Sequence, residues 1–219
     1  VVDTVAVPFI GPFLAAAGVR VPGPIGLIAS LEGGSSKAER TGKFNTSLRA
    51  AVGNVKQGVQ VAVPAAEKAL KAFAQTAQDF DALSKAASDS QDPQVGEALS
   101  LVGETFQAAD ATVSVPIGSA LQAIQQAVIE FQEGADRINP NDIRNPALVA
   151  LQDLDKQLLP DLRKATASAQ GPLRTLQQYL VSAKALVDRS MKAQKAAEAR
   201  ALAEARAEAQ KVVKEALSY

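Results

Sequence analysis

The stretch LRAAVGNVKQGVQVAVPAAEKALKAFAQTAQDF, residues 48–80, decides the fold. Its apolar residues recur at alternating intervals of four and three, and the pattern is sustained over about five heptads. This spacing predicts a long amphipathic helix with one face buried in a core. The polar stretch SDSQ at residues 88–91 marks the end of that helix.

A second apolar stripe with the same spacing covers residues 95–131. The pair Asp92-Pro93 directly precedes it, and this pair has the pattern of an N-cap followed by proline at the first helical position. Folded back at the break, the two stripes predict an antiparallel pair of long helices.

A third stripe covers residues 148–165 and follows the capping pair Asn145-Pro146. We expect this helix to end near Gly171 and a fourth helix to begin at Pro172. The four helices and their short connections predict an all-α protein whose body is an elongated up-down four-helix bundle.

The chain divides into three parts on this interpretation. Residues 1–45 form an apolar, Pro/Gly-rich arm and a polar linker, residues 46–190 form the antiparallel bundle, and residues 191–219 form a charged helical extension. Prolines inside helices remove a backbone hydrogen bond and bend the helix, so we expect kinks at Pro64, Pro116 and Pro160.

The arm contains the stretch VAVPFIGPFLAAAGVRVPGPIGLIASL, residues 5–31, in which Arg20 is the only charge before Glu32. Its prolines prevent a regular helix of the length that a membrane span needs. Three interpretations remain open: the arm completes the core of its own bundle, docks as a strap into another protein, or inserts shallowly at a membrane surface. The residues that we expect to bind a partner are its larger apolar side chains: Val7, Phe9, Ile10, Phe13, Leu14, Val21, Ile25, Leu27 and Ile28.

Residues 32–43 have the composition of a flexible polar linker. A basic cluster begins in this linker and continues into the first helix of the bundle. It is suited to acidic lipid headgroups or to an acidic face of a partner, and a solvated surface is the alternative. Its members are Lys37, Arg40, Lys43, Arg49 and Lys56.

The composition argues against most enzyme classes. The chain has no Cys and no His, which removes thiolate nucleophiles, imidazole bases and ordinary zinc sites. Glu130 and Glu133 could share a helix face, but no matched carboxylate motif faces them, and a solvated surface is the simpler interpretation. We therefore expect no catalysis, no cofactor, no metal and no small-molecule substrate. The net charge of +0 gives no reason to expect nucleic acid as a partner.

A proline- and glycine-rich N-terminal arm, residues 1–45, followed by a four-helix bundle, resembles the Q-type extrinsic subunit of photosystem II and related algal photosystem accessory (linker) proteins. The resemblance implies a lumenal, non-catalytic protein that binds a membrane-embedded core through its arm and bundle surface. The matched features are Pro8, Pro12, Pro22 and Pro24 in the arm and the pairs Asp92-Pro93, Asn145-Pro146 and Gly171-Pro172.

The function that we expect is that of a structural accessory subunit, docked on a large membrane-associated protein complex such as a photosystem. The expected location is peripheral to a membrane, on the lumenal side of the thylakoid. The first residue, Val1, is compatible with removal of a targeting peptide, and a shortened sequence would look the same. Two alternatives remain: a membrane-active bundle of the α-pore-forming type, and a helical carrier of lipid or pigment.

Overall fold

The structure is a computed structural model that describes residues 23–90, 92–139, 141–142 and 144–216. Helices hold 91 % of these residues and no strand occurs among them, which confirms the all-α prediction for the described part of the chain. Every expectation about residues 1–22 lies outside the described residues.

Side-chain caps set the beginnings of two long helices, as the sequence predicts for the second of them. Helix α3 (Thr46–Ala86) begins after Asn45, whose Oδ1 accepts the Leu48 N–H at 2.8 Å. Helix α4 (Pro93–Ala109) begins after Asp92, whose carboxylate accepts the Gln94 N–H at 3.0 Å. Each cap satisfies one of the backbone donors that a helix leaves unpaired in its first turn.

Two helices contain short π-helical segments that are separated by one residue from a following proline. Helix α4 continues through η1 (Asp110–Ser114) into α5 (Val115–Gly134), which ends in the 3₁₀ turn η2 (Ala135–Arg137). Helix α6 (Pro146–Asp153) continues through η3 (Leu154–Leu158) into α7 (Leu159–Ala216). The wider π turns accommodate the missing N–H and the bulky ring of the two prolines that follow, Pro116 and Pro160. Pro64 lies inside α3, which continues through it without a break.

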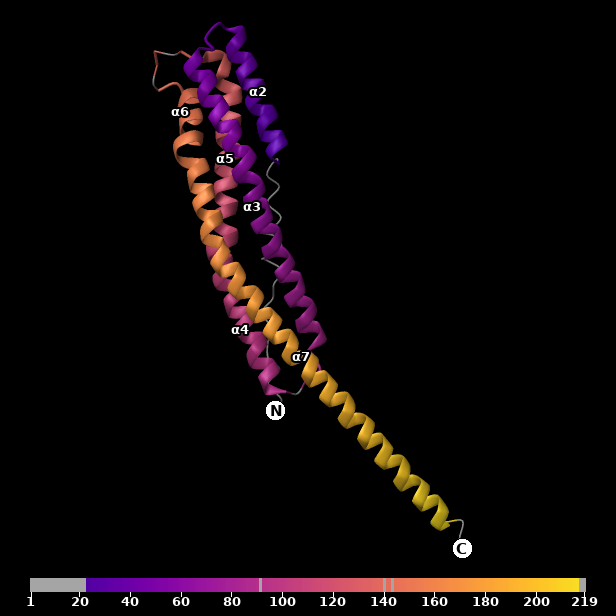
Figure 1. Ribbon diagram of the computed structural model, residues 1–219. Coiled ribbons are helices and arrows are strands. Elements are labelled where there is room, and N and C mark those ends of the chain that lie inside the picture. Colours follow the sequence, from indigo (N-terminus) through magenta and orange to yellow (C-terminus); the bar gives the residue numbers. More distant parts are fainter. Residues whose placement is uncertain (1–22, 91, 140, 143, 217–219) are drawn as a thin grey trace.

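Four helices surround one half of the core, which we call the α2 half. Helix α2 (Pro24–Arg40) packs against α3 and α5, and α6 packs against α5. Helix α7 packs against α3 and α4 farther along the molecule, towards the turn at residues 87–92, and we call that part the far half (Figure 1). The end of η2, which connects to α6, and the end of α3, which connects to α4, lie at opposite ends of this helical body (Figure 1).

The core runs through both halves. In the far half the rings of Phe73 and Phe106, which lie almost equidistant from Ser90 in sequence, stack with their centroids 4.6 Å apart. In the α2 half, Leu27 and Leu31 of α2 are buried together with Phe131 of α5. The buried residues form one continuous cluster.

The structure corrects two predicted boundaries. The expected linker at residues 32–43 is mostly helical, because α2 extends to Arg40 and buries Leu31, Gly34 and Ala38 against the bundle. The expected break at Gly171-Pro172 is absent, since α7 is continuous from Leu159 to Ala216. The apolar stripe keeps its helical phase across this pair, with Ala169, Leu173 and Leu176 all buried, so packing overrides the local preference of proline.

Helix α7 extends well beyond the rest of the molecule (Figure 1). All of its side chains from residue 192 to residue 213 are exposed, including Leu202, Val212 and Val213. At 1.5 Å per residue, the part after Met191 that the structure describes adds about 37 Å to the helix.

A methyl group at Gly34 should destabilise the protein, whereas one at Gly53 should stabilise it. The Cβ atom of alanine at residue 34 would lie 2.6 Å from Cε1 of Phe131, while the same atom at residue 53 has no neighbour within 4 Å. We expect Gly34→Ala to lower the free energy of unfolding by about 1–2 kcal/mol, since overpacking outweighs the gain in helix propensity. Gly53→Ala should raise it by about 0.5–1 kcal/mol.

Urea unfolding of the two variants and the parent chain measures both changes. Equal stabilisation by the two substitutions would show that α2 does not approach α5 this closely.

Candidate functional site

Three of the nine residues predicted to bind a partner are described by the structure. Ile25 is 84 % exposed and Ile28 is half-buried, so both remain accessible at least in part. The expectation is wrong for Leu27, which is 2 % exposed because it belongs to the stripe that seats α2 on the bundle. The other six residues, Val7, Phe9, Ile10, Phe13, Leu14 and Val21, lie outside the described residues.

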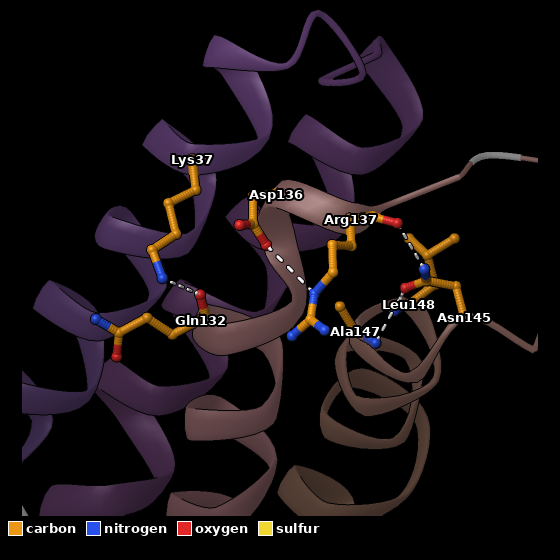
Figure 2. Close-up of polar contacts among 7 residues, drawn as sticks. All are labelled: Lys37, Gln132, Asp136, Arg137, Asn145, Ala147 and Leu148. Atoms are coloured by element: carbon orange, nitrogen blue, oxygen red, sulfur yellow. Dashed lines mark hydrogen bonds and ion pairs between the residues drawn. The ribbon is translucent and has the colours of Figure 1, made fainter.

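The predicted basic cluster does not form one open surface. Lys37 donates a hydrogen bond from Nζ to the backbone carbonyl of Gln132, at 2.9 Å, near the C-terminal end of α5 (Figure 2). A cation is favourable there because the last carbonyls of a helix carry partial negative charge. Lys56 of α3 pairs with Glu32 of α2 at 3.2 Å. Both lysines therefore fasten α2 to its neighbours.

Arg49 makes a similar connection. Its guanidinium lies 3.8 Å from Glu39 of α2 and 5.2 Å from the centroid of the Phe44 ring. Exposed ion pairs of this kind contribute about 0–1 kcal/mol, so their role is to orient α2 more than to stabilise it. The two remaining members of the cluster, Arg40 and Lys43, are exposed.

A buried asparagine joins the end of η2 to the start of α6 (Figure 2). Asn145 accepts the backbone N–H of Ala147 at 3.1 Å and that of Leu148 at 3.4 Å through Oδ1. Its Nδ2 donates to the carbonyl of Arg137 at 3.0 Å. The predicted cap at Asn145-Pro146 is therefore confirmed, and the same side chain also closes the connection between two helices.

A hollow of about 300 Å³ opens between the first turn of α3 and the segment formed by α6 and η3. Leu48, Ile138 and Leu151 form its apolar floor. Its volume lies at the low end of the roughly 300–1,000 Å³ typical of small-molecule sites. The polar side chains at its rim are Lys43, Asn45, Ser47, Gln152, Asp155 and Lys156.

The acidic residues singled out from the sequence do not form a metal site. Glu130 and Glu133 line a second hollow of about 280 Å³ with Arg137, and Glu130 accepts a hydrogen bond from Gln126 at 2.9 Å. Among the described residues no group of carboxylates is arranged to hold a metal ion. The helices within the described ranges also include none with the length and apolar character of a membrane span.

Comparison with protein-family models, with curated proteins and with solved structures gave no match. Function is therefore inferred from the geometry of the chain. The sequence missed two features of this geometry: α2 as a packed helix and the second role of Asn145. The spacing of Leu27, Leu31, Gly34 and Ala38 was the available signal for α2, whereas nothing local in the sequence points from Asn145 to the Arg137 carbonyl.

Replacing Asn145 should cost more stability than replacing an exposed cap of the same chemistry. We expect Asn145→Ala to lower the free energy of unfolding by about 2–3 kcal/mol, because a buried side chain loses both its cap and its hydrogen bond to the Arg137 carbonyl. Asn45→Ala, whose side chain makes only the cap to Leu48, should cost about 1 kcal/mol. Chemical denaturation of both variants gives the comparison, and equal losses would argue against the link between η2 and α6.

Proposed function

We propose that this protein is a non-catalytic accessory subunit that docks on a large membrane-associated protein complex. Contact is made by its N-terminal arm and by the surface of its helical body. The resemblance noted in the sequence suggests a photosystem as the complex and the thylakoid lumen as the compartment. No cofactor and no small-molecule substrate are needed for this role.

We propose an elongated up-down bundle in which α2 is the fourth helix in the α2 half, preceded by the apolar Pro/Gly-rich arm. The order of contacts supports it, because α2 touches α3 and α5 while α7 touches α3 and α4. The path of the chain in Figure 1 agrees with this order.

The projection of α7 is the observation that carries the proposed function. A helix exposed on every side from residue 192 to residue 213 buries nothing within the described part of its own chain. Helices of this kind act as spacers or contacts between separate bodies. A protein that works alone in solution has little use for such an element, whereas a subunit that bridges parts of an assembly does.

The position of Gly23 gives further support. A methyl group placed on Gly23 would lie 3.7 Å from Oε1 of Glu67, so the first residue that the structure describes lies beside the middle of α3. Ile25, in the first turn of α2, is almost fully exposed at the same place. An apolar segment that begins on the side of a long bundle is well placed to contact a second protein along that side.

The two alternatives have less support from the geometry. A carrier needs a cavity for its cargo, and the apolar hollow beside Leu48 is small for a lipid or pigment. A membrane-active bundle would use the apolar arm against lipid instead of against protein. Leakage of dye from lipid vesicles would favour this second alternative, and lipid that stays bound through purification would favour the carrier.

Substituting the large apolar residues of the arm should weaken association with the complex. In mild detergent, the parent protein should migrate on native gels with a large complex, identified by mass spectrometry. The combined variant Phe9→Ser, Ile10→Ser, Phe13→Ser and Leu14→Ser should raise the ratio of unbound to complex-bound protein about tenfold over the parent, since each serine removes apolar contact.

The matched control replaces exposed apolar residues outside both the arm and the projecting end of α7, with Val61→Ser and Val181→Ser in one chain, and should leave the arm contact intact. Circular dichroism must show that both variants are folded at the temperature of the assay. Migration of the parent protein without other proteins, at the position of the purified single chain, would overturn the accessory-subunit proposal.

A further inference from the structure

In the α2 half, four helical segments occupy the corners of a square. Helix α2 contacts α3 and α5, and the α6–η3–α7 helix contacts α3 and α5 from the other side. By contrast, α3 and α5 make few contacts with each other, which is the relation of helices at opposite corners. Helix α2 thus fills the corner between them.

In the far half, α3 and α4 keep the same diagonal relation although α2 no longer separates them. Each packs extensively against α7, and they make few contacts with one another. The stacked rings of Phe73 and Phe106 bridge the distance between them. In the part of the chain that the structure describes, no helix occupies the fourth corner here, and we call this place the open corner.

The side of α3 that faces the open corner is apolar and has small residues. Lys56, which pairs with Glu32, marks the side that α2 covers. Steps of seven residues from Lys56 remain on this side in a supercoiled bundle and lead into the far half. They reach Val63, Leu70, Ala77 and Ser84, all of which are buried.

The side of α4 that faces the open corner has the same character. Phe131 of α5 touches Gly34 of α2, and steps of seven from it lead to Ile124 and Ile117. The π turn inserts one residue, so the series resumes at Ala109 and continues to Val102 and Val95. The last three are 2 %, 1 % and 2 % exposed.

We propose that the open corner is the docking site of the chain's own residues 5–22. Helix α2 begins at Pro24, beside Glu67, so it cannot cover Leu70 and Ala77, which nevertheless are buried. Gly23, which directly precedes α2, lies beside Glu67, at the end of this corner nearer to α2. Residues 5–22 come directly before Gly23 in the chain, so they are the nearest apolar segment that can fill the corner.

The length and the side chains of the segment fit the site. The distance along α3 from Glu67 to Ala87 is about 30 Å, which about ten residues of extended chain can span, and the segment has eighteen. Small residues at the corner, such as Ala77 and Ala109, leave room for Phe9 and Phe13. Ser84 Oγ is buried without a hydrogen-bond partner among the described residues and can donate to a backbone carbonyl.

The charges also match. Arg20 is the only charged residue in the segment, and it precedes Gly23 by three positions. Glu67 lies beside Gly23, where its carboxylate can meet the Arg20 guanidinium. The segment therefore brings one positive charge to the end of the corner that has a carboxylate.

Docking in the open corner has a consequence for binding a partner. The same apolar side chains cannot contact the corner and a second protein at once, so association with a complex requires the segment to leave its seat. This inference concerns the protein without its partner, and it stands whether or not the proposed accessory function is correct.

Photo-crosslinking of the full chain tests the proposal. We replace Phe13 with p-benzoylphenylalanine, irradiate the dilute purified protein and map the crosslinks by mass spectrometry. Crosslinks within one chain to residues 70–84 or 95–109 are expected. The same photo-reactive residue at the exposed position Leu202, in the projecting part of α7, should give none to these ranges. Crosslinks from Phe13 only between chains, only to other residues, or to nothing would overturn the proposal.

Thiol labelling gives a second measurement that does not depend on the bulky probe. Ala77→Cys and Ala62→Cys are made separately, since the chain has no other cysteine and both alanines are buried. Adding the four arm serines should make Cys at residue 77 react about tenfold faster with a maleimide, because its cover is lost. Cys at residue 62, in the α2 half, should react at an unchanged rate. An equal change at both positions, or no change at either, would overturn the proposal.

Discussion

The close contact of Gly34 with Phe131 is the constraint on which the shape of this protein depends. A glycine in α2 allows the aromatic ring of α5 to approach its backbone, and the neighbouring Lys37 then reaches the carbonyl of Gln132. These contacts hold α2 at the fourth corner of one half of the bundle. Because α2 occupies that corner, α3 and α5 stay at opposite corners of the square. The same separation persists between α3 and α4, where the described chain provides no fourth helix. This separation leaves the open corner in the far half, next to the start of α2.

The sequence predicted the parts of the fold that depend on local pattern. The heptad spacing at residues 48–80 gave the long helix α3, and Asp92 and Asn145 cap the helices that follow them as expected. It failed where packing overrides composition. The run Gly33-Gly34-Ser35-Ser36 in α2 has the composition of a linker, yet Gly34 is small because a ring lies against it. Gly171-Pro172 has the pattern of a helix start, yet the stripe on either side keeps one phase, and the packing of that stripe compensates for the lost hydrogen bond.

The candidate site was harder to predict because its interactions are distant in sequence. A basic cluster looks like one surface when the residues are close along the chain. In the structure, Lys56 pairs with Glu32, and Lys37 binds the Gln132 carbonyl near the C-terminal end of α5. No local pattern in the sequence could identify these partners. In the same way, the apolar residues of the arm share one composition, but Leu27 belongs to the core while Ile25 faces outward. Composition can show that a segment is to be covered, and only the arrangement of helices shows what covers it.

The length of α7 has a consequence for the hydrodynamic behaviour of the molecule. Its 58 residues form a rod of about 87 Å, for which the radius of gyration of a thin rod, its length divided by √12, is about 25 Å. A compact chain of this size would have a radius of gyration of about 17 Å. The friction of such a body exceeds that of a sphere of equal mass, so the single chain should sediment slowly and elute early from a sizing column. An early elution volume therefore does not indicate self-association for this protein, and its mass in solution must be measured by a method independent of shape, such as light scattering.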